Sequence, residues 1–311
     1  MNASLKAKIA NHRLPGCQTP VELGQCCVFL GETLAARAEG VTDLLTGNND
    51  LGTLGLGLLI AGAAAGLFSG VLGRGAGLIL VPALYLVLSA AGVAADLRMH
   101  LAIGTALACL LPLSLAALSS EVRSVDWKAA KPVIGPLVIG IVSGAAFGAW
   151  ASSTTLALIF AAVALTAAAL TVLVKRETAG TPPLGIAGAA LAFAYGAVAS
   201  AVGVGGGSFG VPMLTLCRTK HPPAMAALFA TSVAVVGAIA AVLFGWNASR
   251  LPQYSYGYVN LLAFGIIAPV AFATAAIARH YAEAIEAKRL HLLFAGFVVL
   301  STVKMVWSVV G

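Results

Sequence analysis

Charged residues are scarce in this 311-residue sequence: they make up only 9% of it, whereas 60% of the residues are hydrophobic. In an ordinary soluble domain about a quarter of the residues are charged. So few charges cannot cover the apolar surface of a water-soluble fold of this size, but a lipid environment needs no such cover. The mean hydropathy of +0.97 agrees with this view. The composition therefore excludes a soluble globular protein and predicts a polytopic helical membrane protein.

The sequence also lacks the residue spacings that usually mark a metal centre or a catalytic site. Its cysteines form no C-x-x-C pair, and its five histidines fall in loops or at the edges of apolar segments. An intramembrane enzyme needs a nucleophile and a base, or a metal, at one depth. We therefore predict no enzymatic activity and expect neither a cofactor nor a metal. An intramembrane enzyme acting on a lipid-borne or sulfur substrate is the alternative class.

Acidic side chains are missing from the interior of the apolar segments, because all 11 Asp and Glu residues lie in the N-terminal segment or in predicted loops. Proton-driven carriers commonly place carboxylates inside the membrane, so no proton relay is expected. The 18 Lys and Arg residues give a net charge of +7. Basic loops on the cytoplasmic side of a membrane account for that surplus without a nucleic-acid partner.

Residues 1–50 differ from the rest because they contain no apolar run long enough to cross a bilayer. Thr19, Pro20 and Glu22 match the start of a helix, with an N-cap hydroxyl, a first-turn proline and a carboxylate at the third helical position. Apolar residues then recur every three or four positions as far as Leu45. We expect an amphipathic helix that lies on the membrane surface or against the helix bundle.

From residue 51 onward the sequence repeats itself at an offset of 130 residues, so that residues 66–82 align with residues 196–212. Within the first of these segments Gly66, Gly73, Gly75, Gly77, Val81 and Pro82 each meet an identical residue in the second. Further along, Gly104-Thr105-Ala106 resembles Ala230-Thr231-Ser232, and Trp127 resembles Tyr258. The body of the chain therefore divides into two membrane repeats, 51–180 and 181–311.

Each half has room for five apolar helical segments, since about 20 residues of helix cross the hydrocarbon core. Because five is an odd number, the second half enters the membrane from the opposite side and the halves form an inverted repeat. The predicted fold class is an all-α polytopic membrane protein of about ten helical segments in two inverted five-segment repeats, with broken or re-entrant helices at the glycine clusters described below. The segments are expected near 52–71, 78–92, 100–119, 132–150, 154–174, 184–202, 208–217, 223–246, 258–279 and 289–310.

The basic residues outside the N-terminal segment predict the orientation of the chain. Only Arg98 and Arg250 fall on one face. The other face should be cytoplasmic, because Lys and Arg accumulate in cytoplasmic loops. It carries Arg123, Lys128, Lys131, Lys175, Arg176, Arg218, Lys220, Arg279, Lys288 and Arg289.

Two glycine clusters interrupt the apolar runs at residues 73–77 (GRGAG) and 203–207 (GVGGG). Backbone groups left unpaired in hydrocarbon are costly, so an irregular stretch at that depth must line a cavity or be buried in protein. Helices that restart after such a break point their N-terminal amides into the cavity, which suits an anion. We expect Pro82 and Pro212 near the first turn of the restarted helices. Close helix packing through small residues is the alternative, but two matching clusters favour a binding site.

The candidate anion-binding residues come from both halves. Arg74 places a strong charge in the first cluster, where a cation at membrane depth points to function; snorkelling to an interface is the alternative. Hydroxyl groups can donate to an oxyanion, and Thr105 and Thr231 match each other in the repeat. Ser208 is placed to cap the second restarted helix. The full set comprises Ser69, Gly73, Arg74, Gly75, Gly77, Thr105, Gly203, Gly205, Gly206, Gly207, Ser208, Thr231 and Ser232.

The doubled glycine clusters with their Val-Pro pairs, the Gly/Ala-Thr pairs that follow and the tandem halves resemble the sulfite exporter family TauE/SafE, also called the four-toluene-sulfonate uptake permeases. The resemblance covers residues from about 52 to 311 and leaves out residues 1–50. It implies a carrier in a bacterial-type cell (inner) membrane for sulfite, organosulfonates or related sulfur compounds. Arg74 stands where the family usually has an apolar residue, and Ala76 stands where it usually has glycine.

The predicted function is export of sulfite, or of a related sulfur oxyanion or organosulfonate, by alternating access between the two halves. Membrane potential can drive such export, since an anion leaving a negative-inside cell gains roughly 2.3 kcal/mol per charge for each 100 mV. Uptake of another small organic or inorganic anion is the alternative within transport. The expected partners are a small anionic sulfur substrate and the lipid bilayer, and a second copy of the chain in a homodimer is a further candidate.

Overall fold

The computed structural model describes residues 49–72, 76–173, 186–205, 214, 222–248, 250–281 and 287–310. The chain divides into two compact units, Met1–Gly55 and Leu56–Gly311, and the contacts given below all lie within the second. The amphipathic helix predicted in residues 1–50 and, apart from Leu214, the segment predicted at 208–217 lie outside the described residues. The boundary predicted between the two halves at residue 180 also lies outside them and stays a prediction.

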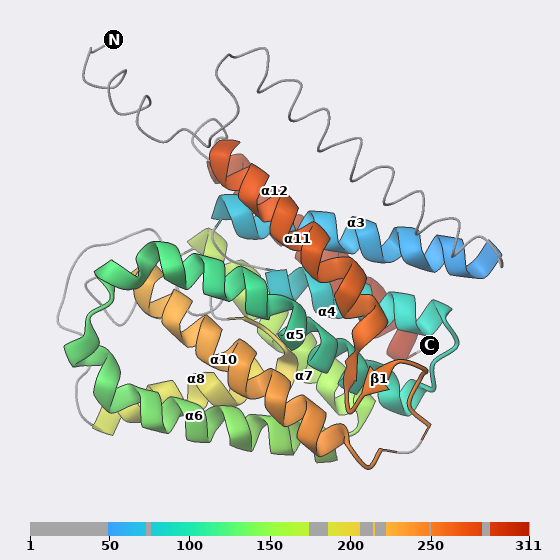
Figure 1. Ribbon diagram of the computed structural model, residues 1–311, viewed down its shortest axis with the longest axis horizontal. Coiled ribbons are helices and arrows are strands. Elements are labelled where there is room, and N and C mark those ends of the chain that lie inside the picture. The colour runs from blue at the N-terminus through green and yellow to red at the C-terminus, as the bar shows by residue number, and fades with distance from the viewer. Residues whose placement is uncertain are drawn as a thin grey trace, which may run out of the picture. The chain divides into compact units, whose positions relative to one another are not determined.

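Nine α-helices make up most of the described chain (Figure 1). They are α3 (Asn49–Leu72), α4 (Ala76–Ala90), α5 (Ala95–Glu121), α6 (Trp127–Trp150), α7 (Ser153–Leu173), α8 (Ile186–Val202), α10 (Pro222–Gly245), α11 (Leu261–Tyr281) and α12 (Ala287–Val310). A 3-10 turn, η1 (Val122–Ser124), follows α5. Each helix overlaps a segment that the hydropathy of the sequence predicts. The prediction of a mainly helical chain is therefore confirmed, with nine helices rather than ten among the described residues.

A short antiparallel hairpin precedes α11. Its strands are β1 (Ser255–Tyr256) and β2 (Val259–Asn260), with Ser255 paired to Asn260 and Tyr256 paired to Val259. No pattern in the sequence predicts this hairpin, because its strands are only two residues long. The hairpin places Tyr258 between the end of α10 and the start of α11.

Five stretches of helix are long and apolar enough to cross a membrane: Leu54–Val71, Ala95–Ser124, Trp127–Trp150, Pro222–Gly245 and Leu261–His280. About 20 residues of helix are needed to span the hydrocarbon core. At 15 residues α4 is shorter than that, and so is α8 at 17 residues. Helix α4 begins within the first glycine cluster, and α8 ends directly before the second. Each of the two short helices therefore adjoins one of the glycine clusters.

The core of the unit lies around α4 and α5. All residues from Ala76 to Pro82 in α4 are buried. In the apolar stretch that includes α5, 67% is buried inside the protein, compared with 22% in the stretch that α6 forms. Large side chains such as Trp150 of α6, which is 90% exposed, face outward. The exposure of apolar residues on the outer helices is what a lipid-facing surface requires.

Helices α6 and α8 run parallel to each other and touch through glycines (Figure 1). A Cβ atom on Gly140 would overlap the backbone of Phe193, and a Cβ atom on Gly144 would overlap the backbone of Ala197. The residue numbers of the contacts increase along α8 as they increase along α6, so the two helices run in the same direction. Small residues spaced four apart allow this close approach of two helix backbones.

Helices α3 and α11 form a second parallel pair of the same kind. Gly62 of α3 lies against the backbone of Ile267, and Gly66 lies against the carbonyl of Ala271. One turn further along, Gly70 lies against the next turn of α11. Each glycine is four residues after the last, so the contact continues along one face of α3.

Helices α5 and α10 pack against each other in opposite directions. The Thr231 hydroxyl of α10 donates to the Ser114 carbonyl of α5 at 3.1 Å. Earlier in α5, Leu107 lies beside Gly237, where a Cβ atom would be 3.2 Å from its side chain. The residue numbers of the contacts thus increase along α10 as they decrease along α5, so the two helices are antiparallel.

Three helix starts differ from the expectations, and one of them is that of α6, which begins at Trp127, five residues before the expected start at 132. Helix α4 begins at Ala76, inside the glycine cluster, so Pro82 lies in the helix interior and not in its first turn as predicted. Helix α5 begins at Ala95, five residues before the expected start at 100. Asp96, expected in a loop, therefore lies in the first turn of α5, where a carboxylate interacts favourably with the positive end of the helix dipole. His100 lies one turn further into the same helix.

Candidate functional site

Helix α8 ends inside the protein at the second glycine cluster. Gly203 has a φ of +69°, in the left-handed region that favours glycine. The Gly203 amide donates to the Ser200 carbonyl at 3.4 Å, and the Val204 amide donates to the Ala199 carbonyl at 3.0 Å. These two bonds form a Schellman motif, which stops a helix while satisfying its last carbonyls. Val204 is buried at 1% exposure, so the helix end is covered by protein.

The described parts of the two glycine clusters touch each other. A Cβ atom on Gly77, in the first turn of α4, would lie 2.7 Å from the Gly203 carbonyl oxygen and 2.9 Å from the Gly205 amide nitrogen. It would also lie 3.0 Å from the Cα of Val204. Only glycine fits at position 77 without moving this backbone. The structure thus brings together Gly77, Gly203 and Gly205 of the predicted site residues.

The hydroxyl groups that the sequence singles out bond to the protein backbone. The buried Thr105 hydroxyl oxygen accepts a hydrogen bond from the Asn260 amide at 3.0 Å. The Thr231 hydroxyl donates to the carbonyl oxygens of Ser114 and of Ala227, the latter at 2.9 Å. The predicted role of these residues in substrate binding stays a prediction.

The remaining predicted site residues fall into two groups. Ser69 is buried in α3, and the hydroxyl of the half-buried Ser232 donates to the Leu228 carbonyl at 3.0 Å. The other group lies outside the described residues and consists of Gly73, Arg74, Gly75, Gly206, Gly207 and Ser208.

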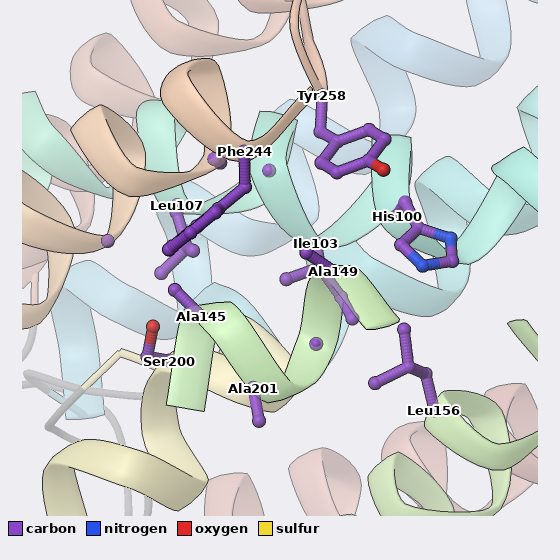
Figure 2. A pocket seen from close by; sticks show the side chains of 14 residues that line it. His100, Ile103, Leu107, Ala145, Ala149, Leu156, Ser200, Ala201, Phe244 and Tyr258 are labelled. Atoms are coloured by element: carbon purple, nitrogen blue, oxygen red, sulfur yellow. The ribbon is translucent and has the colours of Figure 1, made fainter. Parts of the chain in front are cut away.

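A cavity lies beside the end of α8, between α5, α6, α7, α8, α10 and the hairpin (Figure 2). It holds about 340 Å³ of space not filled by atoms, counting its open side. None of the predicted site residues lines it, but a Cβ atom on Gly203 would lie 3.1 Å from the Cα of the lining residue Ile103. The cavity is lined by His100, Ile103, Gly104, Leu107, Ala145, Gly148, Ala149, Leu156, Ser200, Ala201, Gly237, Ala241, Phe244 and Tyr258.

Ser200 is the most enclosed polar group of the cavity wall. It lies in the last turn of α8 and is 2% exposed. Its hydroxyl oxygen finds no hydrogen-bond partner among the described residues. A buried hydroxyl without a partner is costly and calls for an explanation, such as a bound ligand or water.

His100 and Tyr258 lie together at another part of the wall (Figure 2). Their ring centroids are 5.1 Å apart, with 37° between the ring planes. The His100 ring lies between two backbone carbonyls, with Nδ1 3.0 Å from the Asp96 oxygen and Nε2 3.2 Å from the Ala151 oxygen, and the ring nitrogen that carries the hydrogen donates to its carbonyl. Burial raises the pKa of the Tyr258 hydroxyl above its ordinary value, so this group stays neutral at physiological pH.

Close backbone contacts hold the hairpin over the cavity. The Tyr258 amide donates to the Ala241 carbonyl of α10 at 3.1 Å, and a Cβ atom on Gly104 of α5 would overlap the Tyr258 carbonyl. Gly257 has a φ of +57°, and a Cβ atom there would overlap the backbone of Val242. The hairpin therefore packs on Gly104 and on Thr105, of which only Thr105 is a predicted site residue.

Ser200, His100 and Tyr258 are not among the site residues that the sequence predicts. A signal for Ser200 was present in the aligned repeat, because a serine stands there where the first half has Gly70. A hydroxyl in place of a packing glycine indicates a position that is not used for close helix contact. The placement of Tyr258 depends on the hairpin, so no local pattern could have found it.

Comparisons with known proteins agree with the features described above. Residues 58–305 match the family described as "Sulfite exporter TauE/SafE". The chain is 27% identical over 256 residues to a "Probable membrane transporter protein" of Haemophilus influenzae, and the alignment covers 79% of this chain and 96% of that relative. No solved structure matches the chain significantly. The family match spans the glycine clusters and every residue of the cavity wall, and the chain belongs to the sulfite exporter TauE/SafE family of membrane transporters.

Proposed function

We propose that this transporter exports sulfite, or a related sulfur oxyanion or organosulfonate, across the cell inner membrane by alternating access between two inverted halves. The observation that carries the proposal is the contact of Gly77 with residues 203–205, next to a cavity lined by α5, α6, α7, α8 and α10. Broken helices that meet at a cavity are a typical substrate site of secondary transporters. Uptake of another small anion would use the same geometry and is the alternative.

The helix packing supports an inverted relation between the halves. Helices α5 and α10 are each the third of their half, and they run antiparallel. The first helix of each half packs in parallel on the fourth helix of the other half, as α3 does on α11 and α8 does on α6. Equivalent pairs in opposite halves are what an inverted repeat produces.

The start of α4 supports an anionic substrate. Its first turn at Ala76 and Gly77 faces the backbone of residues 203–205, where the second cluster begins. The N-terminal amides and the positive end of a helix dipole favour negative charge within the first turn. We assign Arg74, Gly75 and Ser208 to the same anion path from the sequence pattern.

The cavity lies near one end of the bundle. His100 belongs to the second turn of α5, whereas Gly148 and Phe244 belong to the last turns of α6 and α10. These helix ends adjoin Arg98 and Arg250, on the face that is poor in basic residues and that we expect outside the cell. An exporter with its cavity near that face would be in a state that releases substrate.

The transport function is tested in proteoliposomes that contain the full chain. We expect sulfite flux to follow an imposed membrane potential in the direction that moves negative charge toward the positive side, and to be insensitive to a proton gradient. Flux that ignores the potential but follows the proton gradient would contradict potential-driven export. Counter-flow with labelled sulfite, thiosulfate, sulfoacetate and sulfate identifies the substrate, and failure of all four would contradict the proposed substrate class.

A Gly77→Leu variant tests whether the contact between the glycine clusters is needed for that flux. A leucine side chain cannot fit against the backbone of residues 203–205, so we expect transport to be abolished. Gly135→Leu in α6 is the matched control, because a Cβ atom at position 135 would have no neighbour within 4 Å. Equal flux in the two variants would argue against a role for the glycine contact.

A further inference from the structure

We propose that a belt of exposed aromatic side chains lies among the lipid headgroups of one bilayer surface, and that α6 spans the bilayer from this surface to Trp127 at the other. The inference goes beyond the transport function, because it concerns the lipid contacts of the chain and holds for any substrate. The aromatic belt consists of Trp150, Trp246, Trp307, Tyr254 and Tyr256.

All four tryptophans of the sequence lie at or next to a helix end. Trp127 is the first residue of α6, and Trp150 is its last. Trp246 directly follows α10, and Trp307 lies in the last turn of α12. Their side chains are between 45% and 90% exposed. Tryptophan is favoured where hydrocarbon meets headgroups, because its ring contacts lipid while its N–H group reaches a polar partner.

The ends of α6 and α10 lie together at the hairpin (Figure 1). The end of α6 adjoins the second turn of α5, since His100 contacts the Ala151 carbonyl. Helix α10 is antiparallel to α5, so its end lies at the same level. The Tyr258 amide of the hairpin donates to the Ala241 carbonyl near the end of α10. Trp150, Trp246 and the hairpin tyrosines therefore share one end of the bundle, which we call the hairpin end.

Helix α12 also ends at the hairpin end. Gly66 of α3 lies against Ala271 in the middle of α11, and nearby Phe68 of α3 packs on Phe294, with ring centroids 5.6 Å apart. The first half of α12 is therefore level with the middle of α11. Because α12 begins shortly after α11 ends, the two helices run in opposite directions. Trp307 thus lies at the end where α11 starts, which is the end that carries the hairpin.

The length of α6 matches the thickness of a bilayer. Trp127 and Trp150 are about 35 Å apart along a regular helix, and the hydrocarbon core is about 30 Å thick. Between them Ile139 is 63% exposed and Phe147 is 50% exposed, as lipid-facing residues are. The two tryptophans therefore reach the two boundaries of the hydrocarbon core.

Exposed lysines accompany the tryptophans at both ends. Lys128 and Lys131 follow Trp127 at the start of α6, and Lys304 precedes Trp307 by about one turn of α12. A lysine at this level lays its stem along apolar surface and directs its charge toward the lipid phosphates. The combination of aromatic and basic side chains is typical of a membrane surface.

The aromatic belt is spread over helices that have different neighbours. Helix α6 packs on α8 and α10, whereas α12 packs on α7 and α4. Trp150 and Trp307 therefore do not form one compact patch that a single partner chain could cover. Lipid, which surrounds the whole bundle, is the partner that fits this arrangement.

The aromatic belt also gives the depth of the cavity in the membrane. Gly148 and Ala149 line the cavity directly before Trp150, and Phe244 lines it shortly before Trp246. The cavity therefore lies close to the bilayer surface at the hairpin end and not at the midplane.

Tryptophan fluorescence of the full chain in vesicles of brominated phosphatidylcholine tests the proposal. Bromine quenches a tryptophan only at close range, so bromine atoms near the headgroup and bromine atoms near the end of the acyl chain report two depths. All four tryptophans are assigned to a bilayer surface. The wild type should therefore lose more fluorescence to the shallow bromine atoms than to the deep ones.

Single-tryptophan variants give the depth of each residue. In each variant three of the four tryptophans are replaced by phenylalanine, and every variant should keep the wild-type order of quenching. The matched control is Ile139→Trp in a chain whose four native tryptophans are all phenylalanine. Ile139 is exposed and lies midway along α6, so this variant should lose more fluorescence to the deep bromine atoms.

Iodide added outside the vesicles determines which tryptophans share a side of the bilayer. Vesicles that carry a single chain are captured through a tag on the C-terminus, which selects the chains whose hairpin end faces outward. Iodide crosses a bilayer slowly, so it should quench Trp150, Trp246 and Trp307 and leave Trp127 protected.

Three results would overturn the proposal. The first is stronger quenching of the wild type by deep bromine than by shallow bromine. The second is a belt tryptophan that neither lipid quenches, since protein such as a second copy of the chain would then cover it. The third is quenching of Trp127 by external iodide together with the belt tryptophans. Sulfite flux plays no part in these measurements, so they stand or fall separately from the transport function.

Discussion

The two parallel helix pairs, α3 with α11 and α6 with α8, differ at the third glycine of their contact. In the first pair Gly70 remains pressed against α11, where a Cβ atom would lie 2.7 Å from the Cβ of Ala278 and would overlap the Ala275 carbonyl. In the second pair a Cβ atom on Gly148 would lie 3.8 Å from Ala201, an ordinary contact distance. The α3–α11 pair is therefore in close contact at all three of its glycines. The α6–α8 pair is in close contact at Gly140 and Gly144 but opens at Gly148.

This difference explains where the cavity lies. Gly148 and Ala201, at the open end of the α6–α8 pair, both line it. In the aligned repeat, Ser200 of α8 corresponds to Gly70 of α3. The position that carries a hydroxyl in one half is therefore a packing glycine in the other. A small-residue contact therefore closes the first pair, and its loosening in the second leaves room for the cavity.

The largest effect is expected from breaking the closed pair with Gly66→Val. The new side chain would overlap the Ala271 carbonyl and the Thr274 hydroxyl, so α3 and α11 would have to separate. We expect a loss of about 3 kcal/mol or more of stability, as is typical of severe overpacking. Thermal unfolding of the purified protein in detergent, followed by size-exclusion chromatography, measures the loss.

Gly265→Val on α11 is the control for that variant. It introduces the same β-branched residue into an apolar helix, but a Cβ atom at position 265 has no neighbour within 4 Å. A melting temperature for Gly66→Val that equals that of Gly265→Val would show that the α3–α11 contact is not tight.

An intermediate effect is expected from comparing Gly144→Ala with Gly148→Ala, two substitutions one turn apart in α6. At position 144 the added methyl group overlaps the Ala197 backbone, and we expect about 1–3 kcal/mol of destabilisation. At position 148 it makes an ordinary contact at 3.8 Å, so stability should change by less than about 0.5 kcal/mol. The same unfolding assay compares the two, and equal destabilisation would remove the distinction between closed and open ends.

The smallest effect is expected at the hairpin that covers the open pair. Thr105→Val removes the hydroxyl that accepts the Asn260 amide at 3.0 Å, and the cost should be about 1 kcal/mol. Amide hydrogen exchange at residues 255–260 should become faster, while α4 keeps its protection. Thr166→Val, which removes an exposed hydroxyl bonded only to its own helix, serves as the control. Unchanged exchange at Asn260 would show that Thr105 does not hold the hairpin.

Most of the fold is predictable from hydropathy alone, because an apolar run of about 20 residues has few alternatives to a helix in lipid. The nine described helices agree with the expected segments to within a few residues, except that α5 and α6 each start five residues early, at Ala95 and Trp127. Hydropathy does not predict these first turns, because Asp96 and Arg98 lower it in α5 and Lys128 and Lys131 lower it in α6. Pro82 was assigned to a first turn because the restart of the helix inside a glycine cluster has no sequence marker.

The candidate site is only partly predictable. Gly77 and Gly203 were named from the repeat, and the structure places them in contact. Thr105 and Thr231 were named for their hydroxyl groups, but those groups bond to backbone of distant elements. Ser200 was missed because the value of its hydroxyl depends on the absence of a nearby acceptor. That absence is a property of the packed helices and not of the local sequence.

The pairing of α3 with α11 has a consequence for biogenesis. The glycine face of α3 is made early during synthesis, but its partner around Ala271 emerges only after some two hundred further residues have been inserted. In the meantime that face has only lipid or a transient neighbour to cover it. An N-terminal half made alone would never receive its proper partner, so the two halves have to be completed as one chain, or produced together, before either can mature.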